Sequence, residues 1–269
     1  MSLPVFHVDA FTASRFAGNP AAVCPLVEWL DDDLLRAVAA ENNLSETAYF
    51  VPHGDHYELR WFTPRCEVKL CGHATLASAF VLLQVLAYKR ETVRFETRFS
   101  GALTVCSDGE WLAMDFPALV PWPCANPPAA MIEGLGETPA EVVQIEDNYF
   151  AVYEHEEDVR RIRPNFTLLE KLHPAGVAIT APGVDADFVS RYFAPSYGTP
   201  EDPVTGSTHC SLAPYWGQRL GKSTLHARQV SERGGELWCE VKGECVILKG
   251  RAVLTLQGEM LIYPGSLLL

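Results

Sequence analysis

Trp61-Phe62-Thr63-Pro64, followed by Glu67 and then Cys71-Gly72-His73-Ala74-Thr75, has a counterpart in the second half of the chain. The counterpart is Tyr192-Phe193-Ala194-Pro195, followed by Glu201-Asp202 and then Thr205-Gly206-Ser207-Thr208-His209. In both stretches the glutamate stands five positions before the glycine, and an apolar run that favours a helix comes next. The repeat predicts two related lobes. The polar residues of both copies would face one cleft, which is a hypothesis for an active site.

The segments around the repeat complete a prediction of the fold. Strand-like segments surround both copies, and the helix-like runs over residues 73–88 and 207–220 are apolar enough to be buried. We therefore expect an α+β fold of two similar lobes, each a barrel-like, mostly antiparallel sheet around one central helix. Five prolines in residues 117–128 indicate the crossing between lobes. The expected bounds are 1–117 for the N-terminal lobe and 118–255 for the C-terminal lobe, with 256–269 as a C-terminal segment that could return to the first lobe.

Composition narrows the class of protein and of partner. The chain has 269 residues, of which 48% are hydrophobic and 20% charged, and a formal net charge of -13. These values are typical of a globular protein, and they argue against nucleic acid or an anionic membrane as a partner. The eight cysteines form no CxxC pair and no spacing of a zinc site. The first residues resemble a strand rather than a signal peptide, so we expect a cytoplasmic protein with reduced thiols.

The two junctions between glycine and helix have the clearest chemical interpretation. The first N–H groups of a helix have no partner within it, and the helix dipole adds partial positive charge there. A glycine also lets a ligand approach the backbone closely. Gly72 and Gly206 therefore predict a site that holds a substrate carboxylate and stabilises charge developing beside it. The simpler alternative is that His73 and Ser207 only cap their helices. One junction alone would favour capping, whereas the matched pair favours a site.

Several titratable side chains are candidates for the chemistry. Glu46 lies in a polar turn, residues 41–48, that leads into an apolar strand. A partly buried glutamate can serve as a general base, although a lone glutamate is more often a solvated loop residue. His73 could carry a proton near neutral pH, and Asp202 precedes a proline in what could be an ordinary turn. His209 is expected to lie in the core.

Five short segments together resemble the phenazine-biosynthesis isomerase-like (PhzF) family. They are Val8-Asp9-Ala10-Phe11-Thr12, Gly18-Asn19-Pro20-Ala21-Ala22-Val23, Ser45-Glu46-Thr47-Ala48, Cys71-Gly72-His73-Ala74-Thr75-Leu76 and Glu201-Asp202-Pro203-Val204-Thr205-Gly206-Ser207. The resemblance runs in order over nearly the whole chain. It implies the diaminopimelate epimerase-like fold and cofactor-free isomerisation by proton transfer. The catalytic residues that it implies are Glu46 as the base, supported by His73, Asp202 and Ser207. The residues expected to contact substrate are Asn19, Cys71, Gly72 and Gly206.

One departure from the related epimerases bears on the type of reaction. Those enzymes resemble this chain at both glycine junctions but carry a thiol at each, which gives them two opposed bases. Here Cys71 occupies the first position and Thr205 the second, and a threonine hydroxyl cannot serve as a base. Isomerisation by a single carboxylate base is therefore preferred. Two alternatives stay open: a racemase or epimerase that uses Glu46 and Cys71, and a non-catalytic member of the fold that binds a metabolite or a protein.

The sequence as a whole predicts an isomerase of a small metabolite that bears a carboxylate. No Rossmann glycine motif, P-loop or metal triad occurs in the sequence, so no metal or organic cofactor is expected. A homodimer is a possible assembly. The identity of the substrate does not follow from these residues.

Overall fold

A computed structural model of the chain describes residues 2–146 and 148–262. Two compact units make up these residues: the first spans residues 2–115 and 249–262, and the second spans residues 116–248. The sequence analysis placed residues 249–255 in the second lobe. In the structure they lie with the first unit, because the strand Ala252–Leu261 pairs along the N-terminal strand Ser2–Ala10. The end of the expected C-terminal segment, residues 263–269, lies outside the described residues.

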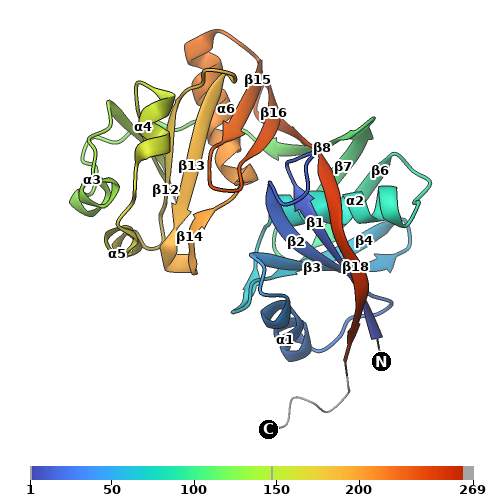
Figure 1. The fold of residues 1–269 in the computed structure, drawn as a ribbon. Helices are drawn as coiled ribbons and strands as arrows, with labels where there is room; N and C mark the ends of the chain where they lie inside the picture. The colour runs from blue at the N-terminus through green and yellow to red at the C-terminus, as the bar shows by residue number, and fades with distance from the viewer. Residues whose placement is uncertain (1, 147, 263–269) are drawn as a thin grey trace. The chain divides into compact units, whose positions relative to one another are not determined.

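The first unit is a sheet with two helices and one π-helical segment. Its elements are β1 (Ser2–Ala10), β2 (Asn19–Pro25), α1 (Asp32–Asn42), β3 (Glu46–His53), β4 (His56–Phe62), β5 (Glu67–Val68), α2 (Gly72–Phe80), the π-helical segment Val81–Val85, β6 (Thr92–Thr97), β7 (Gly101–Asp108), β8 (Trp111–Pro117) and β18 (Ala252–Leu261). Helix α2 contacts β1, β2, β3 and β18 (Figure 1).

The second unit has the same kinds of element with more short helices. Its elements are β9 (Trp122–Pro123), α3 (Ala129–Leu135), β10 (Glu141–Ile145), β11 (Asn148–Val152), α4 (Glu156–Arg161), α5 (Phe166–Leu169), a 3₁₀ turn (Glu170–Leu172), β12 (Gly176–Pro182), β13 (Phe188–Ala194), a 3₁₀ turn (Pro195–Tyr197), β14 (Thr199–Asp202), α6 (Gly206–Leu220), β15 (Thr224–Gln229), β16 (Gly235–Lys242) and β17 (Cys245–Gly250). The short strand β9 lies inside the segment that the sequence predicted as a proline-rich crossing, and it pairs with β10.

The pairing of strands in the first unit recurs in the second. In the first unit β1–β2 is antiparallel, β2–β3 parallel, β3–β4 antiparallel, β4–β6 parallel and β6–β7 antiparallel. In the second unit β10–β11, β11–β12, β12–β13, β13–β15 and β15–β16 follow the same sequence of directions. The buried helix stands at the same point in each series, before β6 in one and before β15 in the other. The sequence repeat therefore corresponds to a repeat of topology.

A partly buried ion pair accompanies each copy of the repeat. Arg60 donates two hydrogen bonds to Glu67, at 2.7 and 2.8 Å, and Arg191 donates two to Glu201, at 2.7 and 2.9 Å. Each guanidinium also lies 5.0 Å from the phenylalanine ring of its own repeat. A bidentate arginine–carboxylate pair fixes orientation as well as distance. The glutamate that recurs before each glycine therefore braces the acidic loop against the preceding strand.

Helix α2 is buried on all sides, as its apolar sequence predicts. All its residues from His73 to Ala79 are buried. The predicted extent over residues 73–88 is wrong, because the α-helix ends at Phe80. A π-helical segment follows, in which the N–H of Leu86 donates to the carbonyl of Val81 at 2.8 Å. Ala87 then adopts a positive φ of 53°, which terminates the helical run.

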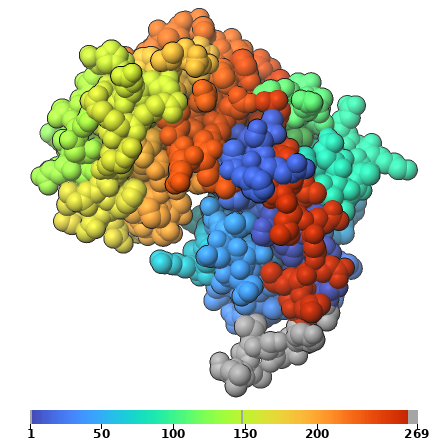
Figure 2. Space-filling model, in the orientation of Figure 1, coloured from blue at the N-terminus to red at the C-terminus, as the bar shows by residue number. Residues whose placement is uncertain are grey.

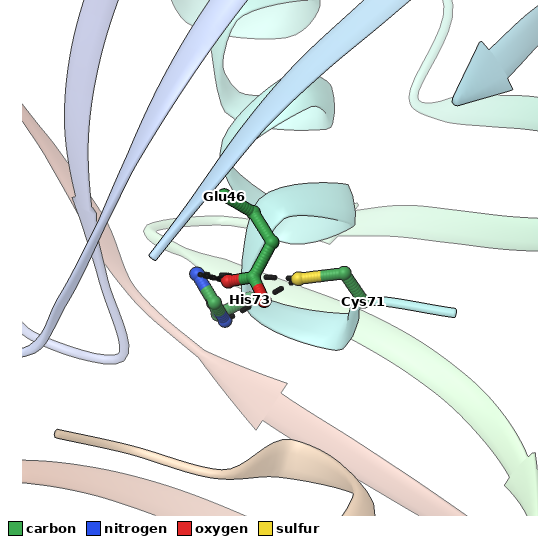
Figure 3. A group of neighbouring side chains, drawn as sticks. All are labelled: Glu46, Cys71 and His73. Atoms are coloured by element: carbon green, nitrogen blue, oxygen red, sulfur yellow. Dashed lines mark hydrogen bonds and ion pairs between the residues drawn. The ribbon is translucent and has the colours of Figure 1, made fainter. Parts of the chain in front are cut away.

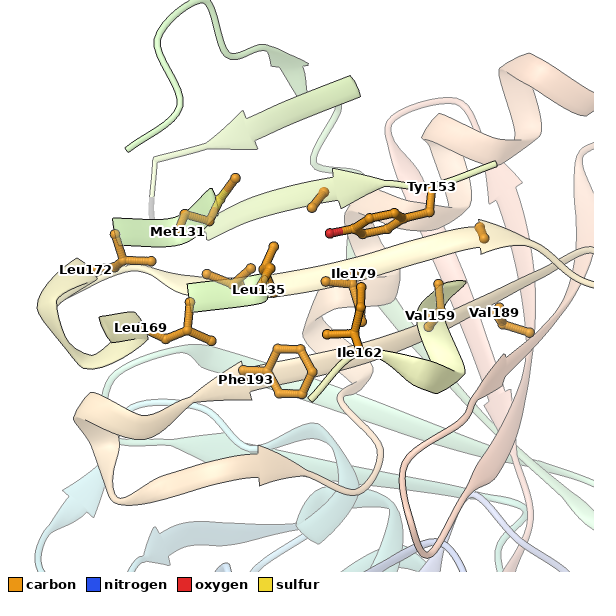
Figure 4. Packing of buried hydrophobic residues seen from close by; sticks show 13 residues of the cluster. Met131, Leu135, Tyr153, Val159, Ile162, Leu169, Leu172, Ile179, Val189 and Phe193 are labelled. Atoms are coloured by element: carbon orange, nitrogen blue, oxygen red, sulfur yellow. The ribbon is translucent and has the colours of Figure 1, made fainter. Parts of the chain in front are cut away.

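The second unit has its own apolar core. Thirteen buried residues pack between the helices α3, α4 and α5 and the strands β11, β12 and β13, and Figure 4 shows them from close by. Phe193 and Ile179 are fully buried there, and α3 contributes Met131 and Leu135. A core of this size stabilises the strand that carries the second copy of the repeat, because apolar burial contributes roughly 25 cal/mol per Å².

The outer strand of the first unit is exposed. Leu256 and Leu261 of β18 are 48% and 68% exposed, and the strand lies on the face in view in Figure 2.

Among the residues that the structure describes, no helix combines the length and the apolar character needed to cross a bilayer.

Candidate active site

Two parallel strands bring the first two site residues to one edge of the sheet. Asn19 is the first residue of β2, and Glu46 is the first residue of β3. The two strands run parallel with Ala21 opposite Glu46. Because parallel strands begin at the same edge, the side chains that open them lie close together. The start of α2 lies against these strands and supplies Cys71 and His73.

The turn before β2 requires a glycine. Gly18 has a φ of +65°, and a Cβ at this position would lie 2.2 Å from the carbonyl oxygen of Ala10. The same loop is held by the carboxylate of Asp9, which accepts a hydrogen bond from the N–H of Phe16 at 2.7 Å. Gly18 and Asp9, which belong to the sequence motifs, therefore have structural roles, because they fix the loop that positions the first residue of β2 in the site.

Glu46, Cys71 and His73 form one cluster (Figure 3). The Oε2 atom of Glu46 lies 3.2 Å from Nε2 of His73. The Sγ atom of Cys71 lies 3.5 Å from Nδ1 and 4.0 Å from Nε2 of the same ring. His73 is 6% exposed and Cys71 7% exposed, while the side chain of Glu46 is 19% exposed. The carboxylate is thus the member of the cluster most accessible to a substrate.

The hydrogen bond with Asn19 indicates which ring nitrogen of His73 carries the proton. Its Nδ2 lies 3.2 Å from Nδ1 of the ring, so the amide N–H donates and Nδ1 accepts. The ring proton therefore lies on Nε2, which is 3.2 Å from Oε2 of Glu46. Burial holds the pKa of His73 well below its ordinary value of 6.5, so the ring is neutral at neutral pH. A neutral imidazole places no positive charge beside the carboxylate of Glu46.

The N-terminus of α2 is open to a ligand. Its N-cap is Cys71, whose side chain makes no capping hydrogen bond. A Cβ built on Gly72 meets no atom of the described residues within 4 Å, and its φ lies outside the left-handed region. Neither packing nor backbone conformation in this unit explains the glycine, whereas close approach of a ligand to the backbone does.

The second copy of the repeat is organised around Gln229. The Oδ2 atom of Asp202 accepts a hydrogen bond from the hydroxyl of Thr205 at 2.5 Å. Gln229 is 1% exposed, and its amide accepts from the N–H of Thr205 at 2.8 Å and donates to the carbonyl of Asp202 at 2.7 Å. The buried amide therefore fixes the turn that leads into α6.

Thr205 occupies in α6 the position that Cys71 occupies in α2. Each residue is the N-cap of its helix, and neither makes a side-chain cap. Gly72 and Gly206 are the first helical residues, which makes His73 and Ser207 the second. The alternative that His73 and Ser207 act as helix caps is therefore wrong. Ser207 is exposed, whereas Gly206 is buried.

The structure places the residues singled out in the sequence in two groups. Asn19, Glu46, Cys71, Gly72 and His73 come together in the first unit, and Asp202, Gly206 and Ser207 stand at the start of α6 in the second. Asn19, which was expected to contact substrate, is fully buried and contacts the imidazole of His73. His209 lies in the core, as expected, and its Nδ1 donates to the carbonyl of Thr205 at 2.8 Å.

Sequence reasoning missed Gln229. A signal was present, because β15 buries alternate residues and Gln229 occupies one of the inward positions, where a strand normally carries an apolar side chain. A polar residue at an inward position is buried only with hydrogen-bond partners, so it marks a structured polar turn nearby.

Comparison with known proteins identifies the family. Residues 8–258 match the family described as phenazine biosynthesis-like protein. The chain belongs to this family. An uncharacterised isomerase of Pseudomonas aeruginosa is 53% identical over 260 residues, which cover 97% of this chain and 99% of the relative. The crystal structure of a PhzF family protein from Enterococcus faecalis superposes with a TM-score of 0.93 at 46% identity, covering 97% of this chain and 100% of that one.

A more distant structure confirms the fold. A probable proline racemase from Agrobacterium radiobacter superposes with a TM-score of 0.62 at 12% identity, covering 98% of this chain and 94% of that one. The α+β fold expected from the sequence is therefore confirmed for this PhzF family member, and so is the resemblance to the family. Like its similar relatives of P. aeruginosa, which are named as isomerases, the protein is an isomerase.

Proposed function

We propose that this PhzF family member isomerises a small carboxylate-bearing metabolite by proton transfer, with Glu46 as its single base and without a metal or organic cofactor. The observation that carries the proposal is the chain of contacts from Asn19 through His73 to Glu46: the amide donates to Nδ1 of the ring, and Nε2 lies 3.2 Å from the carboxylate. These contacts orient a buried imidazole beside the carboxylate, which is the most exposed side chain of the cluster. These are the properties of a general base that is ready to accept a proton.

The open N-terminus of α2 supplies the binding of the substrate carboxylate. Backbone N–H groups at a helix start bind anions, and no side-chain cap competes for them at Cys71. A carboxylate held there lies at the helix end that carries Cys71, close to the carboxylate of Glu46. Negative charge that develops on the substrate during proton removal is stabilised by the same N–H groups. Loss of one such donor typically costs about 10²–10³-fold in rate.

Proton transfer then runs through one carboxylate. Glu46 accepts a proton from the carbon next to the bound carboxylate and becomes neutral, beside Nε2 of His73 at 3.2 Å. The protonated Glu46 returns the proton to another carbon of the conjugated system. His73 stays neutral throughout, because burial disfavours its cation. Retention of the substrate's own hydrogen label follows from a single base that is partly shielded from water.

The residues of the second unit are proposed as supporting groups. Asp202 accepts from Thr205, and Ser207 is exposed one residue after the first glycine of α6. The thiol that related epimerases carry at this point is replaced by a hydroxyl that is already committed to Asp202. A second base is therefore lacking at the position where a two-base epimerisation would need it. Impaired turnover in Asp202→Asn, with substrate binding retained, is the expected result.

A second candidate function rests on the contact between Cys71 and His73. The 3.5 Å separation between Sγ and Nδ1 would let the imidazole accept a proton from the thiol, so that Cys71 and Glu46 could act as the two bases of a racemase or epimerase.

The experiment that tests the proposal is a screen of small amino and hydroxy carboxylates in heavy water, followed by NMR. Turnover that moves a double bond or carbonyl with one stereochemical outcome supports isomerisation by Glu46. Inversion at a single carbon with solvent deuterium in the product, abolished in Cys71→Ser, would instead establish the second candidate.

A further inference from the structure

The site cluster contains the three kinds of ligand that borderline-soft metal ions prefer. Glu46 offers a carboxylate oxygen, Cys71 a sulfur and His73 an imidazole nitrogen, and these atoms all lie within 4.8 Å of one another. Figure 3 shows the three side chains converging from β3, from the start of α2 and from the residue before it. The spacing of cysteines in the sequence gave no indication of this set, because only one cysteine takes part.

The separations are close to those of ligands around one tetrahedral ion. Zinc binds nitrogen at about 2.0–2.1 Å, carboxylate oxygen at about 2.0–2.2 Å and sulfur at about 2.3 Å. Tetrahedral angles then place nitrogen ~3.3 Å from oxygen and ~3.6 Å from sulfur. In the structure Nε2 of His73 lies 3.2 Å from the oxygen of Glu46 and 4.0 Å from the sulfur of Cys71. The oxygen of Glu46 and the sulfur of Cys71 lie within 4.8 Å of each other, so the side chains have to draw together for all three to reach one ion.

The surroundings also hold the nitrogen ligand in place. His73 is 6% exposed. The amide of Asn19 contacts Nδ1 of the ring at 3.2 Å, which is the outer contact that orients a metal-binding histidine. With a metal on Nε2 the ring proton moves to Nδ1, and the amide turns its oxygen towards it.

We propose that Glu46, Cys71 and His73 bind one thiophilic divalent cation of the Zn²⁺ type, which occupies the site in competition with substrate. Three protein ligands leave a fourth position open, as in zinc sites that exchange a ligand. Mg²⁺ and Ca²⁺ do not fit, because they need six or more oxygen ligands. The metal blocks the reaction by taking the lone pair with which Glu46 accepts a proton. This inhibitory consequence rests on the proposed function, whereas binding of the metal does not.

Binding releases one proton. The Sγ–H bond of Cys71 breaks as the sulfur–metal bond forms, and its proton goes to the solvent. His73 keeps one ring proton, which moves from Nε2 to Nδ1, and Glu46 binds through its carboxylate.

Cobalt is the probe that tests the site directly. The full-length protein is reduced, stripped with EDTA, passed into chelator-free buffer and titrated with Co²⁺ under anaerobic conditions. The expected result is a thiolate-to-cobalt charge-transfer band in the near ultraviolet that saturates at one ion per chain, with Zn²⁺ displacing Co²⁺ and Mg²⁺ having no effect. Cys71→Ser should abolish the band, and Asn19→Ala should weaken Co²⁺ binding by about 10–100-fold through loss of the outer contact. Cys66→Ser, which changes an exposed cysteine, should leave the band and its midpoint unchanged.

Each arm has an outcome that overturns the proposal. The proposal is wrong if the wild type shows no charge-transfer band, because no thiolate then binds the metal. It is also wrong if the band persists in Cys71→Ser or is lost in Cys66→Ser, because the metal then binds at another site. Circular dichroism of the metal-free Cys71→Ser protein separates loss of a ligand from loss of the fold. Once a substrate is identified, micromolar Zn²⁺ should inhibit turnover and EDTA should restore it. A correct cobalt spectrum without inhibition would leave the metal site standing and contradict the catalytic role of Glu46.

Discussion

Replacement of Glu46 by glutamine tests the role of its carboxylate in turnover separately from its contribution to the stability of the fold. Glutamine has the shape of glutamate, so its side chain can keep the 3.2 Å approach to Nε2 of His73, and the hydrogen bond from Asn19 to the ring persists. Since no volume is lost, the free energy of unfolding should change by no more than about 1 kcal/mol. The amide cannot accept a proton from carbon. Loss of a positioned general base typically reduces turnover by about 10²–10⁴-fold, or roughly 3–5 kcal/mol of barrier.

The assay compares Glu46→Gln with a matched control, Glu67→Gln. Both glutamates belong to the first unit and are partly buried, with side chains 19% and 15% exposed. Glu67 accepts two hydrogen bonds from Arg60, and it has no role in the proposed mechanism. Turnover of the substrate found in the heavy-water screen is followed by NMR, and unfolding by urea. Glu46→Gln should lose turnover and keep most of its stability, whereas Glu67→Gln should lose stability and keep turnover per folded molecule.

Near-wild-type turnover in Glu46→Gln, with the fold and substrate binding intact, would refute the single-base reasoning. Equal loss of turnover in both variants would show instead that the loop rather than the carboxylate limits the rate.

Three further predictions concern other parts of the molecule. Cys71→Ser should retain most of the turnover, because the proposed base is a carboxylate; a loss beyond about 100-fold in steady-state assays would favour the two-base alternative. Arg191→Ala should lower the free energy of unfolding by about 3–5 kcal/mol in urea titrations, since it leaves the carboxylate of its partner and two buried carbonyls without their donor, whereas the exposed Arg36→Ala should cost less than about 1 kcal/mol. Burial lowers the pKa of His209 from 6.5 to about 4, so the unfolded chain binds a proton at this residue at higher pH than the folded chain does. The free energy of unfolding should therefore fall by up to about 3 kcal/mol as the pH decreases from about 6.5 to about 4. His209→Asn should flatten this part of the stability curve, and an unchanged slope would show that other groups cause it.

Much of the fold was predictable because the repeat is local in sequence. The aromatic–Phe–x–Pro strand end, the glutamate five residues before a glycine and the apolar run after it are each determined by neighbouring residues. Periodicity identified the two buried helices, although not the point where α2 turns π-helical at Val81. That point depends on packing and on a positive φ at Ala87, and neither appears in an apolar run. The return of residues 249–255 to the first unit was missed for the same reason, because a strand's partner is not encoded within the strand.

The candidate site illustrates the same division at the level of single residues. The sequence by itself singled out the candidate side chains: Glu46 stood out in a polar turn before a strand, and Cys71 and His73 stood out on either side of a glycine. Only the tertiary structure decided what they do to one another. The parallel pairing of β2 with β3 places the buried amide of Asn19 against the imidazole, and this contact sets the ring's tautomer. Burial then keeps the ring neutral, and the same convergence creates a set of metal ligands. Tautomers, pKa values and ligand sets depend on distances of a few ångströms between residues far apart in the chain, so they are properties of the folded molecule.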